Sequence, residues 1–204
     1  EIPHCDGLPF LVAQGVEAAN HFQGESFGTK EIEQILRDMR REKENIILIG
    51  MPGVGKTTVG KALGEEMGRT CVDVDQELEK EIGDISTYIT EQGEPAFRKK
   101  EAETIAKLGT ETGLVISTGG GCVTVPKNYA HLRQNGRIYQ LTQPVENLST
   151  SGRVLSSGGI EHLRELEATR TPMYESFAQC IVEHNRNAPE TVAAILEDFE
   201  ANLL

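Results

Sequence analysis

Short apolar runs and helical apolar spacing alternate along residues 45–203. Five runs rich in β-branched and other apolar residues predict strands over 45–50, 70–74, 114–117, 137–141 and 180–183. Apolar positions three and four residues apart predict helices over 56–67, 75–81, 86–92, 95–108, 126–134, 159–177 and 189–203. Such alternation is typical of an α/β fold, in which helices cover both faces of a parallel sheet. We therefore expect a five-stranded parallel sheet.

The first 43 residues show a different pattern, without a strand candidate. A helix of small residues is predicted over 10–21, a polar loop over 23–30, and an amphipathic helix over 31–42. The second helix places Ile32, Ile35, Leu36 and Met39 on one face. We therefore divide the chain into a helical segment, 1–43, and an α/β domain, 44–204. Within that domain, the Gly- and Ser-rich stretch at about 149–162 is expected to be a mobile lid.

The composition is that of a globular protein and narrows the function classes. The 204 residues are 38% hydrophobic and 25% charged, and no apolar run is long enough for a membrane span. A formal charge of −12 argues against a nucleic-acid partner. The four cysteines are scattered without a C-x-x-C pair, and no basic and apolar leader is visible, so we expect a cytoplasmic protein.

Residues 50–57, GMPGVGKT, fit the phosphate-binding P-loop pattern G-x-x-x-x-G-K-[ST]. A predicted strand precedes the motif and a predicted helix follows it, which is the order that a P-loop requires. Its glycines let backbone N–H groups approach phosphate oxygens. Lys56 can reach the β- and γ-phosphates of ATP, and the Thr57 hydroxyl can hold Mg²⁺. The remaining nucleotide contacts are assigned to Gly53, Val54, Gly55 and Thr58.

Asp73 and Asp75 stand where the second predicted strand ends. In doubly wound sheets, ligands bind at the carboxyl ends of the strands. In a phosphotransferase, one of two such carboxylates can support Mg²⁺ while the other accepts the proton of the attacking hydroxyl. The alternative is structural, because an Asp at this position can also cap the helix that begins near Gln76.

Two further features carry candidate chemistry. Gly119, Gly120 and Gly121 follow the third predicted strand, at the same edge of the sheet as the P-loop, and can bring backbone N–H groups to a ligand. Arg98 lies three residues before Glu101, a spacing that allows the two side chains to pair on a helix and aim the guanidinium at a planar carboxylate. The alternatives are a flexible glycine turn and a solvated helix face.

Together these motifs resemble the shikimate kinase family. The resemblance covers about residues 44–204 and rests on the P-loop, on Asp73-x-Asp75, on Gly93-Glu94-x-x-Phe97-Arg98-x-x-Glu101, on the triple glycine and on Arg170-x-Pro172-x-Tyr174. It implies a P-loop NTPase fold of the nucleoside-monophosphate-kinase type with a mobile lid. It also implies transfer of the ATP γ-phosphoryl group to the 3-hydroxyl of shikimate, with Mg²⁺ as the cofactor.

The resemblance implies a role for each matched residue. Asp75 would act as the base and bind the substrate hydroxyls, and Asp73 would support the metal with Thr57. Arg98, Arg170 and the glycines 119–121 would bind shikimate. Arg153 would close over the phosphates as a catalytic arginine, and Arg186 resembles the loop near adenine. Val154 departs from the family, which usually has proline after the lid arginine, and an upstream arginine is missing between Asn147 and Ser151.

The sequence of residues 7–14, GLPFLVAQ, is similar to the C-terminal stretch of shikimate dehydrogenase. This weaker resemblance implies that the helical segment is a piece of a bifunctional dehydrogenase and kinase. An unrelated helical extension is the alternative. We expect a monomeric kinase domain whose N-terminal helices mediate self-association. Two alternatives to shikimate phosphorylation stay open here: another small-metabolite kinase of the same fold, such as a gluconate or nucleotide kinase, and a non-catalytic nucleotide-binding module.

Overall fold

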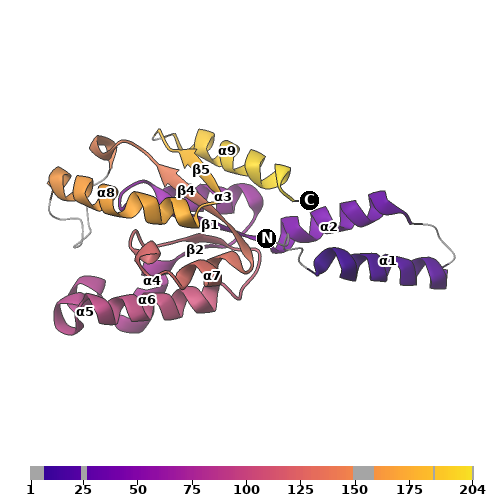
Figure 1. The fold of residues 1–204 in the computed structure, drawn as a ribbon, viewed down its shortest axis with the longest axis horizontal. Coiled ribbons are helices and arrows are strands. Elements are labelled where there is room, and N and C mark those ends of the chain that lie inside the picture. The colour runs from indigo at the N-terminus through magenta and orange to yellow at the C-terminus, as the bar shows by residue number, and fades with distance from the viewer. Residues whose placement is uncertain (1–6, 24–26, 149–158, 186, 204) are drawn as a thin grey trace.

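A five-stranded parallel sheet forms the centre of the computed structural model, which describes residues 7–23, 27–148, 159–185 and 187–203 (Figure 1). Its strands run in the order β2-β3-β1-β4-β5, with every neighbouring pair parallel. Their bounds are β1 Asn45–Gly50, β2 Cys71–Asp73, β3 Val115–Ser117, β4 Gly136–Thr142 and β5 Cys180–Glu183. The predicted α/β fold with five parallel strands is confirmed.

Helices cover both faces of this sheet. On one face lie α3 (Lys56–Met67) and α9 (Ala188–Ala201); α6 (Glu94–Leu108), α7 (Asn128–Arg133) and α8 (Gly159–Phe177) lie on the other. Two short helices, α4 (Val74–Ile82) and α5 (Ile85–Gln92), pack against α6 beyond the β2 edge of the sheet. Two 3-10 turns that we did not predict, η1 (Cys122–Thr124) and η2 (Val145–Asn147), follow β3 and β4.

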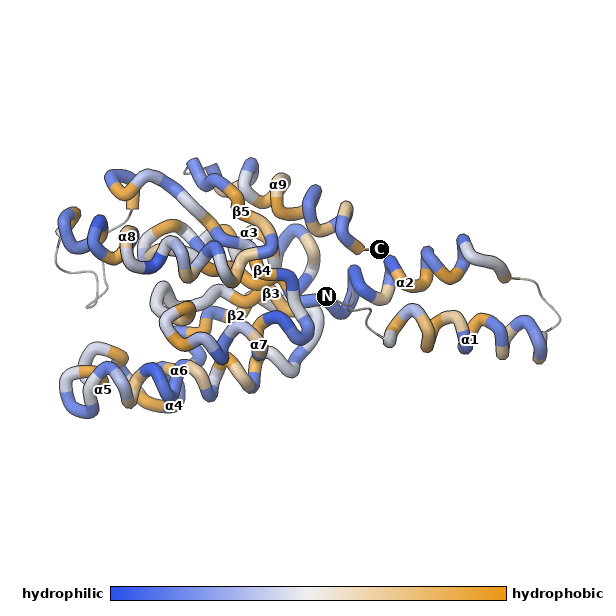
Figure 2. The backbone as a smooth tube through the Cα atoms, in the orientation of Figure 1, coloured by the Kyte–Doolittle hydropathy of each residue, from blue (hydrophilic) through white to orange (hydrophobic). Residues whose placement is uncertain are grey.

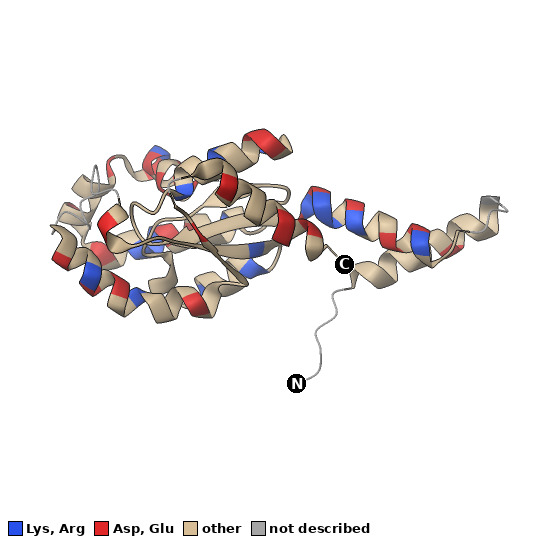
Figure 3. Cartoon of the chain, turned by 90° about the horizontal axis from the view of Figure 1, so that it is seen from above, with Lys and Arg blue, Asp and Glu red and all other residues tan. Residues whose placement is uncertain are grey.

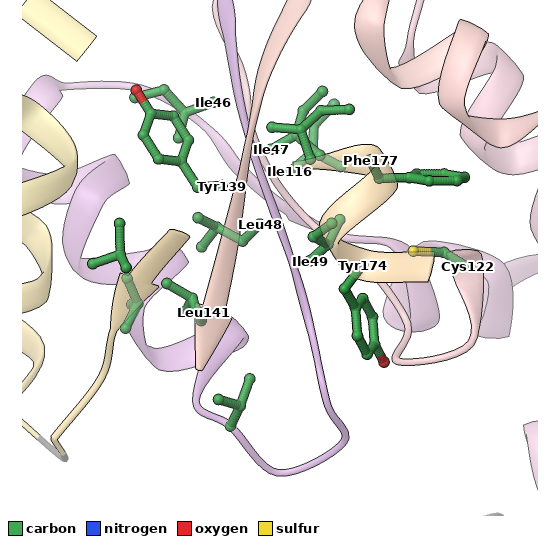
Figure 4. Packing of buried hydrophobic residues seen from close by; sticks show 14 of the residues in the cluster. Ile46, Ile47, Leu48, Ile49, Ile116, Cys122, Tyr139, Leu141, Tyr174 and Phe177 are labelled. Atoms are coloured by element: carbon green, nitrogen blue, oxygen red, sulfur yellow. The ribbon is translucent and has the colours of Figure 1, made fainter. Parts of the chain in front are cut away.

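The core explains why β1 is apolar at nearly every position. All six of its residues are buried, because the strand is central and has helices on both sides. In Figure 4, Ile46 and Leu48 point to the side of Tyr139 and Leu141, whereas Ile47 and Ile49 point to the side of Phe177 and Tyr174. Figure 2 shows the same apolar centre along the chain. Packing in the core therefore fixes the position of the carboxyl end of β1, where the chain passes into the P-loop.

The helical segment forms a hairpin of α1 (Leu8–Gln23) and α2 (Thr29–Lys43) that projects away from the sheet (Figure 1). Val12, Val16 and Leu36 are its buried core, and Ile32 and Met39 pack beside them. Ile35 is 40% exposed, so the predicted apolar face of α2 is narrower than its spacing suggested. Within the described residues, no helix is long and apolar enough to cross a membrane.

Candidate nucleotide and substrate site

The P-loop occupies the turn between β1 and α3. Gly53 and Gly55 have positive φ angles of 80° and 102°, a backbone conformation that strongly favours glycine. Gly55 is the residue before the first turn of α3, whose N–H groups make a helix N-terminus suited to phosphate. The Lys56 side chain is 2% exposed, and its Nζ donates hydrogen bonds to the carbonyl oxygens of Gly50 (2.8 Å) and Met51 (2.9 Å). The loop thus presents a helix N-terminus, with a lysine folded against its own backbone.

Asp73 makes two kinds of hydrogen bond, one with each carboxylate oxygen. Oδ2 accepts a hydrogen bond from the Thr57 hydroxyl at 2.6 Å, across from the P-loop. Oδ1 accepts from the backbone N–H groups of Asp75 (3.1 Å) and Gln76 (3.3 Å) and caps α4. The capping alternative therefore describes Asp73, and it coexists with the contact to Thr57. The cap also ends β2 at Asp73, one residue earlier than predicted.

A cavity of about 420 Å³ lies next to these residues. It brings together candidate residues from four parts of the chain. Its lining includes Thr57, Asp73, Asp75, Arg98 and the three glycines 119–121, together with Pro52, Gln76, Glu79, Asp84, Ile85, Ser86, Ile89, Phe97 and Glu101. The carboxyl ends of β2 and β3 and the P-loop turn after β1 therefore meet at one site, as the doubly wound topology requires.

Arg98 is held by two carboxylates of its own helix. Its Nη1 donates to Glu101 Oε2 at 2.7 Å, and its Nη2 donates to Glu94 Oε1 at 3.0 Å. The predicted pairing of Arg98 with Glu101 is confirmed. Glu101 is fully buried, and burial raises the pKa of its carboxyl while Arg98 opposes the shift. The two carboxylates therefore fix the orientation of the Arg98 guanidinium, part of which lines the cavity.

The triple glycine is needed for space as well as for N–H groups. A Cβ on Gly119 would lie 2.8 Å from Asp75 Oδ1 and 2.5 Å from Glu101 Oε1. One on Gly120 would lie 2.8 Å from Pro52 Cδ, and one on Gly121 would collide with the Arg98 guanidinium. A side chain at any of the three positions would displace a group that lines the cavity.

Arg170 lies behind this turn. Its Nη1 donates to the Gly120 carbonyl at 3.2 Å, and the Tyr174 hydroxyl donates to the same oxygen. Both side chains come from α8 and are buried. Arg170 is thus brought to the triple glycine but is not among the residues that line the cavity.

Two groups of residues remain: predicted site residues that the structure does not describe, and residues of the cavity lining that the sequence did not predict. Arg153, Arg186 and most of the lid lie outside the described residues. Reasoning from the sequence missed Ile85, Ser86 and Ile89 of α5, which line the cavity. The sequence did carry a signal for two of them, because Ile85 and Ile89 lie one helical turn apart and so share a face of the helix. That face is not buried in the core, since the structure buries no residue of α5.

Comparison with known proteins decides the family. The shikimate kinase family model matches residues 52–200. The chain belongs to the shikimate kinase family. A shikimate kinase from Nitrosomonas europaea is 38% identical over 152 residues, which are 71% of this chain and 72% of that protein. One from Thiobacillus denitrificans is 37% identical over 163 residues, which are 76% of this chain and 89% of that protein.

The solved structures agree with the family. A shikimate kinase from Acinetobacter baumannii in complex with shikimate is 31% identical, with a TM-score of 0.72, and covers 81% of this chain and 98% of its own. Shikimate kinases act on shikimate with ATP as the phosphoryl donor, so the chain is an ATP-dependent kinase. This result favours shikimate phosphorylation over the two alternatives.

Proposed function

We propose that the chain transfers the γ-phosphoryl group of ATP to the 3-hydroxyl of shikimate, with the cavity beside the P-loop as the shikimate site. The observation that carries this proposal is the arrangement of Asp75 and the Arg98–Glu101 pair in one cavity with the Thr57 end of the P-loop. A carboxylate that can take a proton and a guanidinium that can bind a carboxylate suit a hydroxylated acid. Family membership supports the same reaction.

On the nucleotide side, Gly53, Val54, Gly55 and Thr58 would contact the phosphates, and Lys56 would leave the carbonyls of Gly50 and Met51 to reach them. The residues present fit Mg²⁺. The Thr57 hydroxyl and the Asp73 carboxylate are hard oxygen donors 2.6 Å apart, and Mg²⁺ is usually held by such groups together with substrate phosphates. When bound, the ion would neutralise charge on the phosphate oxygens. Arg153 and Arg186 are assigned to ATP from the sequence alone.

On the substrate side, Arg98 would bind the shikimate carboxylate, helped by Arg170 and by the backbone of Gly119, Gly120 and Gly121. Asp75 would accept a hydrogen bond from the reacting hydroxyl. The hydroxyl oxygen attacks the γ-phosphorus, the bond to the β–γ bridging oxygen breaks, and ADP leaves with the electron pair. The hydroxyl proton passes to the Asp75 carboxylate.

A coupled assay of ADP release tests this function. We expect ADP release to depend on shikimate, with no comparable release when gluconate or a nucleoside monophosphate replaces it. Mass spectrometry should show a product heavier than shikimate by one phosphoryl group. ADP release that is the same without shikimate, or faster with gluconate, would contradict the proposal.

We also propose that residues 1–43 form a separate segment that pairs with a second copy of the chain. Phe10, Leu11 and Phe22 of α1 are exposed, and Glu17 is the only Asp, Glu, Lys or Arg in this helix, whereas α2 beside it carries many charged residues (Figure 3). The exposed side of α1 is therefore largely apolar. A dehydrogenase tail remains our hypothesis for the origin of this segment. The free thiols of Cys71, Cys122 and Cys180 support a cytoplasmic location.

Light scattering tests the pairing. A variant with Phe10→Ser, Leu11→Ser and Phe22→Ser leaves the hairpin core of Val12, Val16 and Leu36 intact. We expect the unmodified chain to show a concentration-dependent mass and the triple variant to stay monomeric. An equal mass for both proteins at every concentration would contradict pairing through α1.

A further inference from the structure

His184 is a buried histidine beside the P-loop for which the reaction described above has no use. It follows β5 directly, and its backbone N–H donates to the Thr142 carbonyl at 2.7 Å, which extends the pairing of β4 with β5 by one residue. Its side chain is 6% exposed. Both the backbone and the ring are therefore held in place.

The two edges of the imidazole face different elements. Nδ1 lies 2.7 Å from the Thr191 hydroxyl on α9, and that hydroxyl also lies 3.0 Å from the Asn187 carbonyl. A carbonyl can only accept, so the Thr191 proton goes to Asn187 and Nδ1–H donates to Thr191. Nε2 then carries the lone pair. Burial lowers the pKa of the ring, which favours this neutral form.

The other edge of the ring abuts Gly55. A Cβ built on Gly55 would lie 2.8 Å from His184 Nε2 and 3.0 Å from Cδ2, so the ring occupies the space where a side chain would be. Gly55 has a φ of 102° and precedes the first turn of α3, a helix end suited to binding phosphate. The imidazole thus fills the gap between the P-loop and α9.

We propose that His184 is a positioning residue for the nucleotide: its ring edge supports Gly55 and holds the P-loop in its phosphate-binding conformation. It acts through Gly55, without touching the reacting atoms. We expect its effect to be larger on ATP and ADP than on shikimate, because Gly55 is not among the residues that line the cavity, to which the P-loop contributes Pro52 and Thr57. This inference rests on the proposed function, since it concerns the same P-loop.

Two substitutions of His184 test the contacts of the two ring edges separately. His184→Asn keeps a donor near the Nδ1 position and removes the atoms against Gly55. His184→Phe keeps a ring against Gly55 and removes the donor to Thr191. Phe199→Leu is the matched control, because it perturbs the core at the other end of α9, where the Phe199 ring lies under Arg69.

The readout is the Kd of ADP by isothermal titration, with the KM of ATP and of shikimate and the Tm of each variant. Misplacing groups at a site by about 1 Å can lower the reaction rate about a hundredfold. For the milder displacement of a loop that keeps its fold, we expect His184→Asn to raise the Kd of ADP and the KM of ATP roughly tenfold. The KM of shikimate should change less than about twofold. His184→Phe should keep the Kd of ADP within about threefold of the unmodified chain.

Three outcomes would overturn the proposal. They are an unchanged Kd of ADP in His184→Asn, equal losses in His184→Asn and His184→Phe, and an equal loss in Phe199→Leu at the same Tm. Titration with ADP does not involve shikimate. An unmodified chain that binds ADP but does not phosphorylate shikimate would reject the proposed function and leave the role of His184 to be decided by its variants.

Discussion

Three carboxylates around the cavity have different surroundings and so can have different tasks. Asp73 uses both oxygens, one for Thr57 and one for the first turn of α4. Glu101 is buried against Arg98, and one of its oxygens, Oε1, has no hydrogen-bond partner among the residues that the structure describes. Asp75 lies in the first turn of α4, and its Oδ1 lies close to Gly119 at the cavity. Asp73 is engaged by Thr57 and by the helix cap, and Glu101 is buried against Arg98, so Asp75 is our candidate for the proton acceptor.

Asp75→Asn should leave the Kd of ADP nearly unchanged and lower kcat strongly. The amide keeps the shape of the side chain but cannot take the hydroxyl proton, and general-base catalysis contributes about 10²–10⁴-fold. The measurement is steady-state ADP release with saturating shikimate. Glu79→Gln is the control, because it neutralises another carboxylate on the same cavity. A kcat above about a tenth of the original in Asp75→Asn would show that Asp75 is not the base.

Arg98→Ala should weaken shikimate binding more than ATP binding. A charge-assisted hydrogen bond contributes about 1.5–3 kcal/mol, so the KM of shikimate should rise roughly 10–150-fold. Arg98→Lys should restore little, since it lacks the fork that contacts Glu94 and Glu101. Lys99→Ala, at an exposed neighbouring position, is the charge-matched control. Equal losses for both substrates would assign Arg98 to folding or to the nucleotide.

At the scale of elements, α5 depends on a single cap. The Asp84 carboxylate accepts from the backbone N–H of Thr87 (2.8 Å) and from the hydroxyls of Thr87 and Ser86 (both 2.7 Å). These hydrogen bonds lower the pKa of Asp84 to about 2. Because α5 carries Ile85, Ser86 and Ile89 to the cavity, the cap also orders one wall of the proposed shikimate site.

Asp84→Ala should therefore raise the KM of shikimate by roughly threefold without changing the Kd of ADP, because loss of a cap frays the first turn. Asp84→Asn is the control, since Asn caps about as well as Asp. Because the pKa of Asp84 is lowered in the folded chain, its carboxylate contributes fully to folding stability above the ordinary pKa of about 3.9. This contribution is lost as the pH falls toward the lowered pKa. The difference in Tm between the unmodified chain and Asp84→Ala should shrink between about pH 4 and pH 2. A difference that stays constant over this range would contradict the role of the cap.

Elements were predictable where the local pattern and the tertiary structure agree. The bounds of β1, α3 and β5 match the prediction. Apolar runs mark the two strands, and the P-loop motif marks the start of α3. The prediction failed for η1, which packs against α8, an element far along the chain. It also missed His184, because a single histidine after a strand carries no signal until α9 and the P-loop meet around it.

At the scale of the whole molecule, the hairpin is joined to the domain through the end of α2. Arg37 and Arg40 donate to the carbonyls of Glu200 (3.4 Å) and Leu203 (3.2 Å), and Arg41 pairs with the Glu200 carboxylate at 2.9 Å. Arg69, after α3, donates to the carbonyls of Glu44 and Arg41. Sequence patterns placed the boundary near residue 43 but could not show these contacts, which pair residues far apart in the chain.

Deletion of residues 1–42 should leave kcat/KM within about threefold, because the residues that we assign to catalysis come from β1 onward and the backbone lost is that of a projecting hairpin. It should lower Tm, since Arg69 and Glu200 lose the partners that α2 provides. Arg41→Ala is the milder comparison, because it removes the ion pair with Glu200 and keeps the hairpin. Calorimetry and the ADP-release assay, run on the same preparations, separate the two effects. A truncated chain that folds but loses activity would mean that the hairpin completes the site, and the division of the chain at residue 43 would then be wrong.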